Sequence, residues 1–316
     1  MTPAEKEAAA VNDTFERVVA AYGAYIAARV LIEWQAVNRF TPAGRALMVS
    51  QLSILVQGAR LTLATLAVRK ANLIHALRTG TQLAGGDGGR TLQDLRDAFN
   101  ESVLSTGVDR APRARSVNGG IIVPVGNDGD INDIIYDINK DIEDEITGTI
   151  SNLGERRLLK IARSGSVSPE EVERSKTMTA RGLERIALNG ARQTVTEIAD
   201  RNKKVVGYVR VHNRHASDTP CGFCAVLMSR GPVYRSAQTA GESNDYHAGC
   251  HCTVEEVYSN SDWRTNPKYA LNRQFQQDWN AHFKGQYGTN DEAMSYWRKY
   301  IKEHYSSHAA TQAEAA

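Results

Sequence analysis

The four cysteines of the chain all fall within one short window, and this clustering most constrains how the chain can fold. The first two occur as Cys221-Gly-Phe-Cys224 and the other two as Cys250-His-Cys252. His247 precedes Cys250 by three residues and so repeats the spacing of the first pair. Thiolate and imidazole are ligands that zinc favours, and two such pairs joined by a loop are typical of a zinc knuckle. The window therefore predicts a small module held together by one metal ion.

The predicted site has five donors for the four positions of a tetrahedral zinc. In an extended strand Cys250 and Cys252 would point to opposite faces, so we expect one of them to face the core. Four cysteines, or three cysteines and His247, would each complete a closed site. A closed site is structural, because it leaves no position for a catalytic water. Buried free thiols or two disulfides are the alternative to a metal.

The charge balance argues against a chain that binds nucleic acid over its whole surface. Lys and Arg total 38 against 36 Asp and Glu, for a net charge of +2, whereas such binding requires a strongly basic surface. The N-terminus is polar and unlike a signal peptide, and no apolar run approaches the roughly 20 residues of a membrane span. We therefore expect no membrane segment and a reducing cytoplasm, where metal binding is favoured over disulfides.

Apolar residues at three- and four-residue spacing predict a mainly α fold. We expect an extended helical N-terminal body and a small α+β zinc-knuckle module at the C-terminal end. Helices are expected over 3–83, with a new start at Thr41-Pro42, and over 91–104. Ser168-Pro169 begins a further helix or pair of helices that ends near residue 202. A glycine-rich loop is expected at 85–89.

Short strands are expected at 121–125, 205–212 and 254–258, and a final helix at 296–305. Isoleucines at helical spacing over 131–150 predict a helix whose acidic residues form a solvated face: Asp137, Asp141, Glu143, Asp144 and Glu145. The resulting segments are a helical body over 1–110, a linker with further helices over 111–200, the knuckle module over 201–260, a C-terminal helical segment over 261–305 and a disordered tail over 306–316.

Three stretches around the cysteines resemble a known family. They are Gly207-Tyr-Val-Arg-Val, Pro220-Cys-Gly-Phe-Cys-Ala-Val-Leu-Met-Ser-Arg-Gly-Pro-Val-Tyr234 and Tyr246-His-Ala-Gly-Cys-His-Cys-Thr-Val254. Together they resemble the C-terminal module of MuF-like phage head proteins, in the form found in tailed phages of actinobacteria. The helical stretch from Ala187 to Val195 also resembles that family's upstream helix. Tyr208 departs from it, because a tryptophan is usual there. The resemblance covers about residues 177–258.

The resemblance implies a structural minor head protein of a double-stranded DNA phage. Such a protein would lie inside the procapsid and virion head after assembly in the host cytoplasm, and would act in head morphogenesis and DNA ejection. Its implied partners are the portal protein, the scaffold protein and the major capsid protein, with phage DNA as an open further partner. The expected cofactor is structural zinc. We expect no catalytic residue, membrane partner or small-molecule substrate.

Two enzymatic alternatives stay open at this point. Related phage proteins are often labelled capsid maturation proteases, for which Ser229 is the candidate nucleophile, although it lacks the usual Gly-x-Ser-x-Gly elbow and is expected in a loop turn. A zinc-stapled nuclease would use His247 beside Asn244-Asp245 to activate water. His212, Arg214 and His215 form a small basic group that could contact DNA phosphate or a protein partner. Arg110, Arg113 and Arg115 are interpreted as linker charges.

Overall fold

A computed structural model describes residues 2–36, 41–85, 90–107, 125–130, 133–139, 142–233 and 246–305. The fold is mainly α, as predicted. Its elements are α1 (Pro3–Ala36), α2 (Pro42–Thr79), β1 (Gln82–Ala84), α3 (Leu92–Ser105), β2 (Val125–Asp130), α4 (Ile134–Asn139), α5 (Ile142–Thr149), a π-helical turn (Ile150–Glu155), α6 (Arg156–Ser164), α7 (Pro169–Arg201), β3 (Gly207–Val211), α8 (Gly222–Ser229), β4 (Thr253–Val257), α9 (Asn260–Thr265), a 3₁₀ turn (Pro267–Tyr269), α10 (Ala270–His282) and α11 (Asn290–Tyr305).

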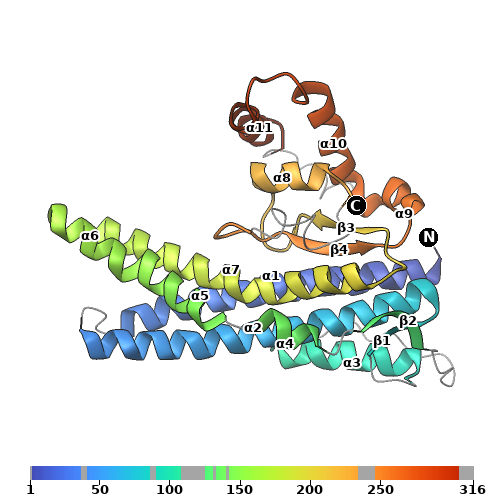
Figure 1. Ribbon diagram of the computed structural model, residues 1–316, viewed down its shortest axis with the longest axis horizontal. Coiled ribbons are helices and arrows are strands. Elements are labelled where there is room, and N and C mark those ends of the chain that lie inside the picture. Colours follow the sequence, from blue (N-terminus) through green and yellow to red (C-terminus); the bar gives the residue numbers. More distant parts are fainter. Residues whose placement is uncertain are drawn as a thin grey trace.

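Three long helices, α1, α2 and α7, lie along one another and form an elongated helical body (Figure 1). The part of the chain from β3 onward lies across one side of this body (Figure 1). Apolar residues that recur at helical spacing line the buried faces, among them Phe15 and Ile26 of α1, Leu63 of α2 and Leu183 of α7. Burial of such side chains is the main favourable term in folding.

Side-chain caps confirm three predicted helix starts. Thr41 accepts a hydrogen bond from a backbone N–H of the first turn of α2, which also carries a proline there. Thr91 forms a capping box with Asp94 at the start of α3, and Ser168 forms one with Glu171 at the start of α7. Such caps satisfy backbone donors that a helix leaves free at its N-terminus.

The helices α2 and α7 approach each other closely where Gly190 faces Arg60. A Cβ atom built at Gly190 would lie 2.4 Å from the backbone oxygen of Arg60. The Arg60 guanidinium is buried there, and it donates hydrogen bonds to the carbonyls of Ile186 and Ile138 at 2.8 and 2.6 Å. The same arginine therefore ties α7 and α4 to α2.

The two strands predicted around the cysteine window are confirmed, with slightly different ends. Strands β3 and β4 pair antiparallel, with Gly207 opposite Val257 and Val211 opposite Thr253. Helices α8, α10 and α11 enclose a second apolar cluster that includes Phe275. This arrangement fixes both halves of the cysteine window, since α8 begins at Gly222 within the first half and β4 begins directly after the second.

Several sequence predictions in the middle of the chain need correction. A strand begins at Val125 and continues to Asp130, and it pairs in parallel with β1, which lies within the stretch expected as helix. The single acidic helix expected over 131–150 is divided into α4 and α5. Within it Ile134, Ile146 and Ile150 are buried, so the isoleucines do face the core. Predictions for residues 86–89, 110–115, 121–124, 131, 141 and 306–316 lie outside the described residues.

Helix α2 bears on the expectation that the chain has no membrane segment, which stays a prediction. This 38-residue helix contains an 18-residue window with a mean hydropathy of 1.3, long and apolar enough to cross a bilayer by length and composition. Core helices of water-soluble proteins pass the same test, and α2 packs against α1, α3 and α7. About 39% of the window is buried in the fold.

A buried network of charges joins the helical body to the C-terminal part. Lys70 of α2 pairs with Glu256 of β4 at 2.8 Å, and both side chains are almost fully buried. Lys268 pairs with Glu16 of α1 at 3.0 Å and also with Glu255 of β4. Burial raises the pKa of Glu16 to about 8. The attraction of Lys268 opposes this rise, and the repulsion of Glu255 adds to it. These pairs connect segments that are distant in the sequence.

Candidate metal centre

The first cysteine pair lies at the N-terminal end of a helix. Cys221 is the N-cap of α8, and its sulfur accepts a hydrogen bond from the backbone N–H of Cys224 at 3.3 Å. Cys224 is in the first turn of the same helix and is completely buried. Backbone donors at a helix N-terminus stabilise negative charge on a thiolate. The local structure thus favours ionised ligands.

The second half of the window is a turn that leads into β4. The backbone N–H of Cys250 donates to the carbonyl of His247 at 3.0 Å, which closes the turn. Gly249 adopts a φ of +77° within it, a conformation that suits glycine. Cys252 immediately precedes the first residue of β4. The turn therefore brings an imidazole and two thiols to the end of one strand.

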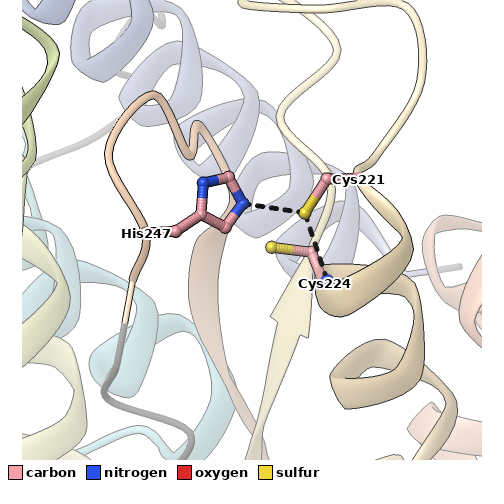
Figure 2. Close-up of side chains that lie close together, drawn as sticks. All are labelled: Cys221, Cys224 and His247. Atoms are coloured by element: carbon pink, nitrogen blue, oxygen red, sulfur yellow. Dashed lines mark hydrogen bonds between the residues drawn. The ribbon is translucent and has the colours of Figure 1, made fainter. Parts of the chain in front are cut away.

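The two halves meet around Cys224. The Nε2 atom of His247 lies 2.8 Å from the sulfur of Cys221, and the three side chains drawn in Figure 2 converge from two separate segments. The donor atoms of Cys221, Cys224 and His247 all lie within 4.8 Å of one another, and so do those of Cys224, Cys250 and Cys252. Cys224 belongs to both groups. All five predicted donors thus form one cluster.

This cluster overturns the expectation that Cys250 and Cys252 diverge. Both side chains are buried, and both sulfurs lie close to that of Cys224. The reason is that β4 begins only at Thr253, so the alternation of an extended strand does not apply to residues 250–252. The separation of 3.2 Å between the sulfurs of Cys224 and Cys250 is a contact distance without a disulfide. The donor spacing is compatible with a metal ion.

Hydrogen bonds among the closely spaced donors shift the pKa values of the cluster. A hydrogen bond with Cys224 raises the pKa of His247 to about 9. The hydrogen bond with Cys221 raises the pKa of Cys224, but hydrogen bonds with Cys250 and Cys252 lower it further, to about 5. The pKa of Cys221 is lowered to about 7, mainly by its hydrogen bond with Cys224. Negative charge is therefore favoured at the Cys221 and Cys224 sulfurs, whereas Cys224, Cys250 and burial raise the pKa of Cys252.

Two buried arginines surround the cluster, and the sequence analysis did not single them out. The guanidinium carbons of Arg192 and Arg210 lie 4.0 and 3.9 Å from the ring centre of Tyr246. Two cations this close cannot share one face, so they sandwich the ring. Arg210 also donates to the sulfur of Cys224 at 3.7 Å. Arg192 donates to the carbonyl of Cys252 at 3.0 Å and to that of Cys250.

This sandwich supplies positive charge beside the thiolates. Burial alone would lower the pKa of Arg210, but attraction from Tyr246 and the cysteines holds it above its ordinary value. Three or four thiolates around a divalent ion leave a net negative charge, which two guanidinium groups offset. A sequence signal existed, because both arginines lie within stretches that resemble the phage family.

The basic group predicted at 212–215 does not form one exposed surface. Only 7% of the surface of His212 is accessible, so the prediction of a surface contact is wrong for this residue. His215 pairs with Asp13 of α1 at 2.9 Å. Arg214 is exposed, and its predicted contact with a partner stays a prediction.

The residues proposed for the enzymatic alternatives lie in different surroundings from those expected. Ser229 is the last residue of α8 rather than part of a loop, and its buried hydroxyl donates to the carbonyl of Val226 at 2.7 Å. A hydroxyl held in this way does not face a substrate. Asn244 and Asp245 lie outside the described residues, whereas the Nε2 atom of His247 contacts the Cys221 sulfur.

Comparison with known proteins adds one finding. A family model described as VG15 protein matches residues 159–281, which run from α6 into α10 and include the whole donor cluster. The match indicates a phage-associated protein. It covers less than half of the chain. No curated protein and no solved structure matches the chain.

Proposed function

We propose that the chain is a non-enzymatic minor head protein of a tailed double-stranded DNA phage, with a C-terminal part fastened by structural zinc. The observation that carries the proposal is the cluster of four thiol groups and one imidazole inside the segment matched to a phage family. The order of these residues resembles the MuF-like module. A closed set of soft ligands suits zinc in a structural role.

The surroundings of the cluster support a role in rigidity. Cys224, Cys250 and Cys252 share one apolar core with Phe15 of α1 and Val195 of α7. A metal ion there would lock the turn before β4 to the start of α8, and Arg192 would connect that turn to α7. The helical body would then be held in a fixed orientation for contact with the portal protein, and with scaffold and major capsid proteins during assembly.

The proposal is tested by locating the protein in phage particles. Quantitative mass spectrometry of purified procapsids and virions should find it at a few copies per particle, and a strain lacking its gene should yield defective heads or non-infectious particles. Absence from both particles would overturn the proposal. Coexpression with scaffold and capsid proteins provides the enzymatic control, because a structural protein leaves the lengths of those chains unchanged.

A further inference from the structure

The exposed face of α2 carries an apolar stripe that nothing in the described chain covers. Leu47, Ile54 and Leu61 are 51%, 72% and 50% exposed. They are spaced by seven residues, so they lie on one line along the helix, over about 21 Å. Isolated exposed apolar residues are ordinary, but an aligned row on one helix marks an interaction surface.

The stripe is uncharged as well as apolar. The exposed residues of α2 between Ala46 and Leu61 are Ala46, Leu47, Ser50, Gln51, Ile54, Gly58 and Leu61. The one charged residue in this interval, Arg60, is buried, and its guanidinium donates to the carbonyls of Ile186 and Ile138. A helix face meant for solvent usually carries charged residues. This one has the composition of a buried helix interface.

The spacing of the stripe identifies its occupant as another helix of the same period. A seven-residue repeat matches the repeat of a facing helix and places each side chain between those of its partner. Gly58 lies in the same face, and a Cβ built there meets nothing within 4 Å. A glycine at that place lets a second backbone approach closely. A lipid surface would require neither the period nor the gap.

We propose that α2 pairs antiparallel with α2 of a second copy of this chain, about a twofold axis at Ile54. Leu47 and Leu61 are equally far from Ile54, so an antiparallel pair places each leucine against the other leucine of the second copy. The stripe is therefore complementary to itself. This inference does not rest on the head-protein proposal.

The charges at the two ends of the stripe fit the same arrangement. Glu143 and Asp144 of α5 border the groove beside Leu61. Arg45 lies at the other end, two residues before Leu47. Antiparallel pairing brings the basic end of one copy to the acidic end of the other, whereas parallel pairing would bring like charges together.

The test is the mass of the purified full chain in solution. Light scattering coupled to gel filtration should give twice the chain mass for the wild type, and half of that for Ile54→Glu, which places a charge on the twofold axis. Ile32→Glu is the matched control, because Ile32 of α1 is 52% exposed but lies outside the stripe. It should remain a dimer. Circular dichroism and zinc content confirm that both variants fold.

Orientation is tested by oxidative cross-linking, with the wild type reporting the background from its native cysteines. Ile54→Cys should cross-link to itself, and Leu47→Cys should cross-link to Leu61→Cys but not to itself. Self-linking of Leu47→Cys would overturn the antiparallel arrangement. A wild-type chain that stays monomeric at all soluble concentrations would overturn the dimer. So would a monomeric wild type that floats with phosphatidylglycerol vesicles when Ile54→Glu does not, because the stripe would then bind lipid.

Discussion

The buried sandwich of Arg192, Tyr246 and Arg210 sets the electrostatics of the metal centre at the scale of single residues. Both guanidinium groups contact the Tyr246 ring, and within the described residues the Nε and Nη2 atoms of Arg210 have no hydrogen-bond partner. A buried cation with so few donors satisfied is stable only beside strong negative charge. Ionised sulfurs of the donor cluster would supply that charge.

Replacing Arg210 by methionine should destabilise the protein, because it removes the charge that offsets the thiolates. We expect a loss of about 2–5 kcal/mol in the free energy of unfolding and weaker metal binding, measured by denaturant titration and competition with a zinc chelator. Arg214→Met is the control, since Arg214 is exposed in the same segment. Unchanged metal affinity in Arg210→Met would show that the sandwich acts through packing alone.

Metal content of single variants identifies the ligand set. Cys224→Ser should lose the ion, because Cys224 is common to both donor groups. Of His247→Ala, Cys250→Ser and Cys252→Ser, one should keep one equivalent of zinc and the other two should lose it, as measured by elemental analysis of the purified chain. Retention of a full equivalent by Cys224→Ser would refute a single shared centre.

At the scale of helices and strands, the close crossing of α2 and α7 depends on Gly190. Gly190→Ala should cost about 1–3 kcal/mol, because the added methyl group overlaps the Arg60 carbonyl and forces the helices apart. Gly148→Ala in α5 is the matched control. Open space surrounds Gly148, so alanine there should be neutral or should stabilise by up to about 1 kcal/mol through its higher helix propensity. Thermal unfolding of both variants measures the difference. Equal melting temperatures would contradict the role of the crossing.

Helices that begin with a capping side chain were predictable from the sequence, whereas helix α8 and the pairing of β1 with β2 were not. The starts of α2, α3 and α7 were predictable, because a capping side chain marks each one. Helix α8 was not, since its eight residues are nearly all apolar and show no polar face. The pairing of β1 with β2 joins segments about 40 residues apart in a parallel sheet, which no local pattern records.

The donors of the candidate site were predictable for a similar reason, and their surroundings were not. That the five candidate donors would lie together was predicted from their spacing. The burial of His212 depends on how β3 packs, so its sequence position beside Arg214 and His215 was misleading. The arginine sandwich assembles from α7, β3 and the turn at Tyr246, three separate parts of the chain.

At the scale of the whole molecule, the buried charges between the helical body and the C-terminal part make stability depend on pH. The pKa of Glu16 is raised to about 8, above its ordinary value of 4.5. Between these values the folded state keeps a proton that the unfolded state releases, so the free energy of unfolding falls as pH rises. The contribution is complete below about pH 4.5 and lost above about pH 8.

Glu16→Gln removes this titration and should flatten the decline between pH 5 and 8 by an amount on the order of 1–3 kcal/mol. Denaturant unfolding at several pH values measures it. Glu33→Gln is the control, because Glu33 is a partly exposed residue of the same helix. A wild-type stability that does not decline over this interval would contradict the raised pKa of Glu16.

The shared core has a consequence for the synthesis of the protein on the ribosome. Helix α1 is synthesised long before α7 and the cysteines near residue 250, with which it shares an apolar core. Most of the chain must therefore leave the exit tunnel before the apolar face of α1 has its final partners. We expect the nascent chain to expose this face for most of translation, and truncations that end before β4 to be bound by host chaperones and degraded.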